Sequence, residues 1–263
     1  MPRDELLGAV SSAYAWHRAF GNASFDTTLA RFVVNQSHPR VWSANHVSRV
    51  AASAQAEIEA VMAEMERRFA HCRHRTVVTD CFTPPSFLAR LALDDYREQT
   101  PLLQMVLSDA LARITPTAIV LRAVAADPDW DDLERLAKVD FQEGLRSGRN
   151  ELPDDVVRGI VGGYRRKSRV AQFFIAETGG APCAYGSAVE CPGNLGMLED
   201  FFTLPQYRGR GIATTLISHC VDHLRGRGAR SIFIGAHVTE RAKHLYAKLG
   251  FVPLMVSREW VKG

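Results

Sequence analysis

The spacing of apolar residues in the first half of the chain predicts alternating helices and strands. Over residues 54–70 apolar residues recur at helical period with charged residues on the opposite face, which is typical of a helix packed on a core. This stripe consists of Ile58, Val61, Met62, Met65 and Phe69. Similar patterns predict helices at residues 6–20 and 84–94, and strands at residues 29–34, 41–50, 75–80 and 102–107.

The second half shows the same alternation more clearly. Apolar runs at residues 171–177 and 183–191 flank a Gly179-Gly180 pair and predict a β-hairpin. The other expected strands lie at residues 117–124, 197–205, 231–236 and 251–256, with helices at about 126–141, from 153, at 212–224 and at 239–249, the last capped by Thr239. We therefore expect an α/β protein with a mixed sheet.

A change of pattern at about residues 112–116 predicts two domains, 1–114 and 115–263. The segments HCRHRTVVTD, FLARLALDDY and LLQMVL follow one another as RGARSIFIGA, RAKHLYAKLGF and PLMVSREW do later. This weak internal echo suggests that the first unit is a degenerate copy of part of the second.

Composition favours a cytoplasmic protein with an ordinary core. Apolar residues make up 46% of the chain, and the net charge is only +3, with Lys and Arg spread along the sequence, so no nucleic-acid partner is expected. The N-terminus is acidic, and no apolar run reaches the roughly 18 residues of a membrane span, so neither a secretory signal nor a membrane partner is expected. The five cysteines show no CxxC spacing, which argues against disulfides and zinc.

The stretch from Arg208 to Ala213 (RGRGIA) is the strongest chemical signal. It lies between a predicted strand and a predicted helix, and the free N–H groups of a helix N-terminus bind anions. Gly209 and Gly211 allow close approach of the backbone, and two arginines add positive charge. The alternatives are an ordinary turn or, together with Arg165-Arg166-Lys167, a surface for nucleic acid or phosphoprotein. No P-loop Lys-Ser/Thr follows the glycines, and the third glycine of a dinucleotide-binding loop is missing.

These motifs resemble the GNAT acetyltransferase superfamily. Its signature Arg/Gln-x-x-Gly-x-Gly/Ala is matched by Arg208-x-x-Gly211-x-Ala213, and Ala242-x-x-Leu245-Tyr246-x-x-Leu249-Gly250-Phe251 resembles the family's last helix and following strand. The resemblance covers about residues 117–260. It implies a GNAT fold and transfer of an acetyl or other short acyl group from acetyl-CoA to an amine, without a metal. A member of the family would act in a ternary complex on a small-molecule or peptide amine, as a monomer or homodimer.

The resemblance also assigns roles to residues. Backbone groups of one strand would pair with the pantetheine arm, and amides of the loop and helix would hold the pyrophosphate. These cofactor-binding residues are Phe201, Phe202, Thr203, Arg208, Gly209, Arg210, Gly211, Ile212, Ala213 and Thr214. Tyr246 matches the tyrosine that protonates the departing sulfur, and Thr239 stands where many members have asparagine.

The general base is expected on the strand before the loop. Strand alternation would send Glu199 and Asp200 to opposite faces, so only one can face the substrate, and we favour Glu199. The pair His219 and His223 has i, i+4 spacing but no third metal ligand in the sequence. The main alternative function is a non-catalytic module that senses acyl-CoA.

Overall fold

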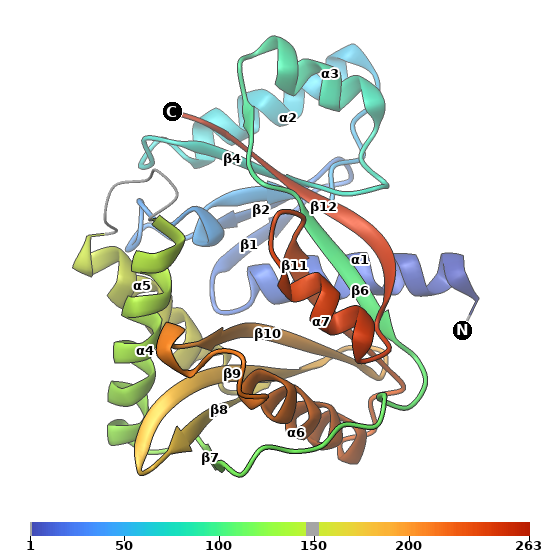
Figure 1. Cartoon of the computed structure of the whole chain (residues 1–263). Helices are drawn as coiled ribbons and strands as arrows, with labels where there is room; N and C mark the ends of the chain where they lie inside the picture. Colours follow the sequence, from blue (N-terminus) through green and yellow to red (C-terminus); the bar gives the residue numbers. More distant parts are fainter. Residues whose placement is uncertain (1, 146–152) are drawn as a thin grey trace. The chain divides into compact units, whose positions relative to one another are not determined.

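The computed structural model describes residues 2–145 and 153–263 (Figure 1). The chain folds into two compact units, each made of segments that are not contiguous in the sequence. One comprises residues 1–104, 236–240 and 253–263, and the other comprises residues 105–235 and 241–252.

The first unit is built on a mixed sheet. Its strands are ordered β1-β2-β3-β4-β12, with β3 and β4 parallel, the other pairs antiparallel, and β5 also paired with β12. The elements are α1 (Arg3–Ala19), β1 (Ala23–Asp26), β2 (Arg31–Val34), the 3-10 turn η1 (Trp42–Ala44), β3 (His46–Ser48), α2 (Gln55–Arg68), β4 (Arg75–Thr79), α3 (Pro85–Leu93) and β5 (Arg97–Glu98), with β12 (Val252–Lys262) entering from the end of the chain.

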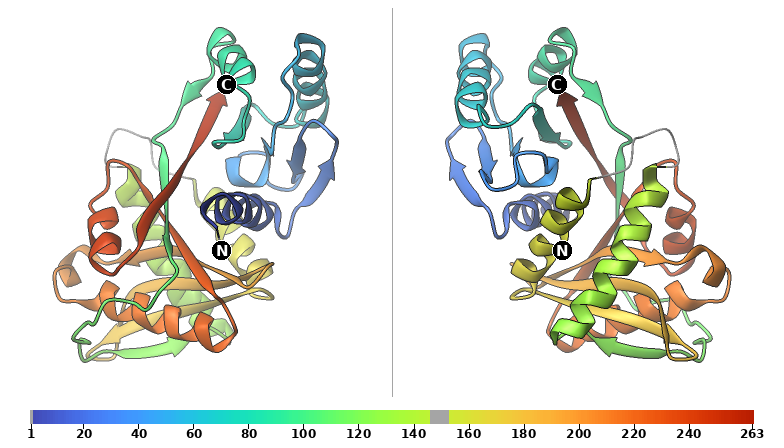
Figure 2. Two further views of the ribbon diagram at one scale, coloured as in Figure 1. Left: turned by 90° about the vertical axis from the view of Figure 1, so that its right-hand side faces the viewer. Right: turned by 90° about the vertical axis from the view of Figure 1, so that its left-hand side faces the viewer.

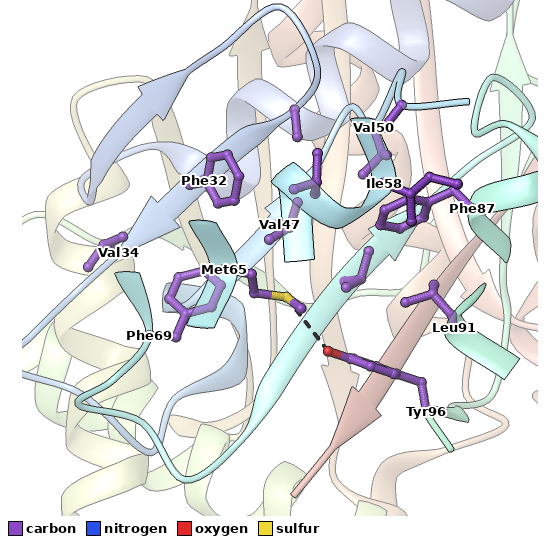
Figure 3. Packing of buried hydrophobic residues seen from close by; sticks show 14 of the residues in the cluster. Phe32, Val34, Val47, Val50, Ile58, Met65, Phe69, Phe87, Leu91 and Tyr96 are labelled. Atoms are coloured by element: carbon purple, nitrogen blue, oxygen red, sulfur yellow. Dashed lines mark hydrogen bonds between the residues drawn. The ribbon is translucent and has the colours of Figure 1, made fainter. Parts of the chain in front are cut away.

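One face of this sheet carries an apolar core (Figure 3). Phe32 and Val47 on the strands meet Ile58 and Met65 on α2, and Phe87 on α3 closes the cluster. The predicted stripe on α2 is confirmed, since four of its five residues are buried and Met62 packs against the core. Tyr96 donates its hydroxyl to the Met65 sulfur at 3.8 Å (Figure 3).

The second unit holds a five-stranded sheet ordered β7-β8-β9-β10-β11. All neighbouring pairs are antiparallel except β10 and β11, which are parallel. Helices α4 and α6 lie on opposite faces of this sheet, and α5 packs beside α4 (Figure 2). The elements are β7 (Val120–Ala123), α4 (Asp127–Leu145), α5 (Asp154–Lys167), β8 (Ala171–Thr178), β9 (Ala181–Cys191), β10 (Leu195–Thr203), η2 (Pro205–Tyr207), α6 (Ile212–Gly226), β11 (Ser231–His237) and α7 (Ala242–Lys248). Strand β6 (Leu102–Leu107) runs from the first unit into the second.

Most predicted elements are present, and the mixed sheet is confirmed. Two predictions are wrong. Residues 41–50 form a 3-10 turn and only a three-residue strand, and α7 begins at Ala242 with Arg241 at its N-cap, so Thr239 does not cap it. The predicted domain boundary at 114/115 concerns the evolutionary origin of the two parts, which the boundaries of compact units do not test. It therefore stays a prediction, as does the expectation that the first domain is a degenerate copy of part of the second. Within residues 2–145 and 153–263, none of the helices combines the length and apolar character that crossing a membrane requires.

Candidate functional site

The loop before α6 is shaped for close approach to its backbone. Gly209 and Gly211 have φ values of 75° and 79°, in the left-handed region that favours glycine. Gly211 is the N-cap of α6, and the first intrahelical bond runs from the Thr215 amide to the Gly211 carbonyl at 3.0 Å. The amides of the first helical turn precede that bond and point out of the helix end, as an anion site requires. They belong to Ile212, Ala213 and Thr214.

Thr117 fixes this loop from the side. Its hydroxyl donates to the Arg210 carbonyl at 2.7 Å, and its amide donates to the Thr215 hydroxyl at 2.9 Å. A Cβ built on Gly211 would overlap the Thr117 hydroxyl, whereas a Cβ on Gly209 meets no heavy atom within 4 Å. Gly211 is therefore required by both backbone conformation and packing, and Gly209 by conformation alone.

Arg208 braces the loop instead of extending freely into solvent. Its Nη1 donates to Glu143 on α4 at 2.7 Å, a second guanidinium nitrogen pairs with the other Glu143 oxygen, and its Nε donates to the Thr203 carbonyl at 2.9 Å. The Glu143 hydrogen bonds raise the pKa of Arg208. Its guanidinium also lies 5.6 Å from the centre of the Phe202 ring. Arg210 remains exposed, with its guanidinium 5.4 Å from the centre of the Tyr207 ring.

Strand β10 is no longer paired with β11 along one edge just before this loop. Its parallel ladder with β11 runs from Leu195 opposite Ser231 to Leu198 opposite Ile234 and stops there, although both strands continue. On the other side the antiparallel ladder with β9 continues to Thr203. The last five residues of β10 therefore present a strand edge on the side from which β11 has diverged, immediately before the helix N-terminus.

A β-bulge within this edge changes which side chains share a face. Glu199 pairs with Ser187 and Phe202 with Tyr185, so Asp200 and Phe201 together oppose a single residue of β9. Asp200 takes φ 60°, a left-handed value uncommon for a residue other than glycine.

The expectation that Glu199 and Asp200 point to opposite faces is wrong because of this bulge. Glu199 is the cross-strand partner of Ser187, which lies two residues from Tyr185 and therefore on the same face of the sheet. The hydroxyl of Tyr185 reaches Asp140 on α4, so this face is the one that α4 covers. Asp200 accepts a hydrogen bond from Tyr164 on α5, which packs beside α4. Both carboxylates therefore face the α4–α5 side, and Phe201 takes the opposite face, where its ring covers Gly186.

Two buried tyrosines beside the bulge were not recognised in the sequence. The Tyr164 hydroxyl donates to Asp200 Oδ1 at 2.9 Å, and the Tyr185 hydroxyl donates to Asp140 Oδ2 at 2.7 Å. Burial raises the pKa of Asp200, while Lys167 acts in the opposite direction. Burial, followed by the nearby carboxylates, raises the pKa of both phenols well above the usual value. The available signal was the hydroxyl-bearing Tyr185 in the mostly apolar strand β9.

The remaining candidates lie elsewhere in the second unit. Tyr246 is buried on α7, with its ring 6.2 Å from that of Phe251, and its role at a departing sulfur stays a prediction. His219 and His223 both pack edge-on against Phe174, at 4.6 and 5.4 Å between ring centres, so they serve packing. Among the residues described, no cluster of three or more metal-ligating side chains occurs.

A groove of about 630 Å³ lies along the later turns of α6 and is separate from this loop. It is lined by the segment 108–114 and by Ser218, Val221, Asp222 and Arg225 on α6. Arg225 donates to the carbonyls of Ser108 and Asp109 at 3.2 and 3.0 Å and so holds that segment against the helix. None of the predicted site residues lines this groove.

Comparison with known proteins matches the part of the chain that contains this site. A family model described as the acetyltransferase (GNAT) family matches residues 130–251. A protein of Methanocaldococcus jannaschii described as an uncharacterized N-acetyltransferase is 29% identical over 100 residues, which are 34% of this chain and 43% of that protein. The chain thus matches less than half the length of that relative.

Solved structures match nearly the whole chain in fold. A GCN5-related N-acetyltransferase from Kribbella flavida superposes with a TM-score of 0.73 at 11% identity, covering 96% of this chain and 94% of that one. A tandem GNAT protein from the clavulanic acid biosynthesis pathway superposes with a TM-score of 0.60 at 15% identity, covering 89% and 78%. At these identities the likeness establishes the fold alone.

Proposed function

Residues 130–251 belong to the GNAT acetyltransferase family, and from that premise we propose that this protein transfers an acetyl or other short acyl group from acyl-CoA to an amine. The observation that carries the proposal is the open edge of β10, which leads directly into the glycine loop and the N-terminus of α6. A donor with an amide-bearing arm and a pyrophosphate is complementary to a strand edge followed by a helix N-terminus.

The strand register indicates which amides face the donor. Leu204 donates to the Cys183 carbonyl at 2.9 Å, and Phe202 is the cross-strand partner of Tyr185, so their backbone groups point toward β9. The alternate residues Phe201 and Thr203 then turn their amides to the open side. We propose that the Thr203 amide pairs with the pantetheine arm, that the Phe201 amide faces the acyl end of the donor, and that Phe202 contributes its ring.

The loop supplies the pyrophosphate site in this proposal. The amides from Gly209 to Thr214 surround the helix end, and the exposed Arg210 adds a positive charge. Arg208 acts through its pair with Glu143, which holds the loop in place. A side chain at Gly211 would displace Thr117, so the conformation of the loop depends on glycine at this position.

The chemistry needs a proton acceptor for the amine, hydrogen-bond donors for the developing oxyanion and a proton donor for the leaving thiolate. Glu199 and Asp200 lie at the bulge, on the face opposite Phe201, and either carboxylate can take the amine proton. The Phe201 amide at the open edge is our candidate oxyanion donor, and Tyr246 is our candidate acid for the sulfur. Direct attack by the bound amine then needs no covalent enzyme intermediate.

Calorimetric titration with acetyl-CoA, followed by thiol release with a panel of amines, tests this function. We expect saturable binding of acetyl-CoA, weakened at least tenfold in Gly211→Ala, and thiol release that depends on an amine. A matched control is Gly179→Ala at the β8–β9 turn. Gly179 also has a positive φ, and a Cβ there meets nothing within 4 Å, but it lies outside the loop.

The outcomes separate the proposal from its main alternative. Binding without thiol release from any amine would identify a module that senses acyl-CoA. No binding of CoA or its thioesters, in a protein that folds normally, would refute both functions.

A further inference from the structure

An irregular connecting segment, residues 108–117, lies along α6 in the second unit. It follows β6 and forms neither helix nor strand. Its side chains are exposed except at every third position, where Leu111, Ile114 and Thr117 are half-buried and turn one side of the segment toward the protein. The segment precedes residues 130–251, so it lies outside the part of the chain that the family model matches.

Polar contacts hold the connecting segment at three places. At its start, Arg225 on α6 donates to the carbonyls of residues 108 and 109 at 3.2 and 3.0 Å. In its middle, the Ala112 amide donates to the Leu249 carbonyl just after α7 at 3.0 Å. At its end, Thr117 contacts the loop before α6. Because the segment is already held before Thr117 and enters β7 soon after it, ordering Thr117 costs little further conformational entropy.

Thr117 and Thr215 supply hydroxyl donors to two successive carbonyl groups of the loop. The Thr117 hydroxyl donates to the Arg210 carbonyl at 2.7 Å. The Thr117 amide donates to the Thr215 hydroxyl at 2.9 Å, and this hydroxyl donates in turn to the Gly211 carbonyl at 3.2 Å. The directions of the Arg210 and Gly211 carbonyls are therefore fixed by the same pair of threonines.

The direction of a carbonyl also determines the direction of the next amide. In a trans peptide unit the C=O and the N–H point to opposite sides. The Arg210 carbonyl shares its peptide unit with the Gly211 amide, so the bond from Thr117 turns the Gly211 amide away from the connecting segment. The Gly211 carbonyl shares its unit with the Ile212 amide, which points out of the helix end.

Glycine makes the orientation of this peptide unit easy to lose. Gly211 has a φ of 79°, and glycine adopts φ values of either sign at similar cost. The peptide unit between Arg210 and Gly211 can therefore rotate, which would direct a carbonyl oxygen, instead of an amide, toward a bound anion. This rotation breaks the hydrogen bond from Thr117, so that bond opposes it.

We propose that Thr117 is a positioning residue for the donor: through the Arg210 carbonyl it keeps the Gly211 amide directed at the pyrophosphate of acyl-CoA. The inference rests on the proposed function and adds to it a residue from outside the matched part of the chain. The connecting segment thereby favours donors that carry the nucleotide, because the pantetheine arm lies along β10 and does not meet this peptide unit.

Two substitutions of Thr117 separate the hydroxyl from the shape of the side chain. Thr117→Val keeps the branched side chain and removes the donor, whereas Thr117→Ser keeps the donor. In calorimetric titration we expect the Kd for acetyl-CoA to rise about threefold to tenfold in Thr117→Val, the effect of one hydrogen bond on the competent population, and to stay near the wild-type value in Thr117→Ser. The matched control is Thr178→Val, which removes another half-buried hydroxyl of the second unit, 3.7 Å from the Cys183 sulfur, and should leave the Kd unchanged.

Donor fragments identify the part of the donor that Thr117 affects. The nucleotide half alone, 3′-phosphoadenosine 5′-diphosphate, should lose affinity for Thr117→Val by the same factor as acetyl-CoA. S-acetylpantetheine carries the same thioester and arm without the nucleotide, so its kcat/KM should not change. With acetyl-CoA, KM should rise while kcat stays near the wild-type value, as loss of binding common to ground state and transition state predicts.

The outcomes distinguish this inference from the proposed function. Failure of the wild-type protein to bind acetyl-CoA would refute the proposed function and this inference with it. Where the wild type binds acetyl-CoA, an unchanged Kd in Thr117→Val overturns the inference and leaves the function intact. An equal loss toward S-acetylpantetheine, or a loss that Thr117→Ser shares, also overturns it, because a merely structural role of Thr117 would give either result.

Discussion

Substitution of Gly211 by alanine is the most informative single change in the loop. The left-handed backbone of Gly211 opposes any side chain, and a Cβ there would also overlap the Thr117 hydroxyl. Gly209→Ala is its matched control, because Gly209 has nearly the same φ but open space around a Cβ. The difference between the two variants therefore measures the overlap with Thr117 and not the backbone strain.

The magnitudes follow from these contacts. The left-handed conformation costs a non-glycine residue about 1–2 kcal/mol, which both variants bear. To admit a Cβ at Gly211, Thr117 must move and lose its hydrogen bond to the Arg210 carbonyl, which adds about 0.5–1.5 kcal/mol. Thr117→Ala alone loses the same bond. The double variant Gly211→Ala/Thr117→Ala loses that bond only once, so its cost should fall short of the sum by about 0.5–1.5 kcal/mol.

Urea unfolding of the four variants gives these free energies, and calorimetry with acetyl-CoA reports the function of the loop. We expect affinity for acetyl-CoA to fall more in Gly211→Ala than in Gly209→Ala, because the amides of the first helical turn move with Arg210. Strict additivity of Gly211→Ala and Thr117→Ala, or equal costs for the two glycine variants, would refute this account of the loop.

Three further outcomes are expected. Tyr246→Phe should keep its affinity for acetyl-CoA while turnover falls ~10²-fold, as loss of a general acid predicts, and unchanged turnover would exclude Tyr246 from the mechanism. Arg208→Lys should weaken acetyl-CoA binding because it removes the bidentate ion pair with Glu143. Glu143→Gln should also weaken binding, although it removes a negative charge from the site. Stronger binding in Glu143→Gln would show that this charge matters more than the stabilisation of the loop by Arg208. Burial lowers the pKa of His74, so the unfolded state binds the proton first and stability should fall as pH drops below about 6.5; His74→Gln should reduce that slope in acid unfolding curves, and an unchanged slope would assign it to other groups.

The sequence could predict those elements of the fold whose residue pattern lies within a single helix, strand pair or loop. The α2 stripe and the β8–β9 hairpin follow from residue spacing within one element. The loop from Arg208 to Ala213 was found because its glycines and arginines are adjacent in the chain. The GNAT resemblance added the order of strand, loop and helix, which the structure confirms.

The partners of these residues could not be predicted because they lie far away in the sequence. Tyr164 and Asp200 are 36 residues apart, and Arg208 and Glu143 are 65 apart. No periodicity links such positions, since tertiary packing alone brings them together. Arg208 was therefore expected only to add positive charge beside the pyrophosphate, and its pairing with Glu143 in the structure was not predicted.

The bulge in β10 shows why a single backbone torsion matters for the chemistry. Regular alternation would have separated Glu199 from Asp200 and left one carboxylate at the site. At the bulge, Asp200 adopts a left-handed conformation and β10 has one more residue than β9. Both carboxylates therefore lie on the α4–α5 side, and the Phe201 ring lies on the other side. Such a backbone conformation costs energy in a residue other than glycine and persists only where surrounding contacts hold it. Here the hydrogen bond from Tyr164 to Asp200 is one of those contacts, so the placement of the two candidate bases depends on this local distortion.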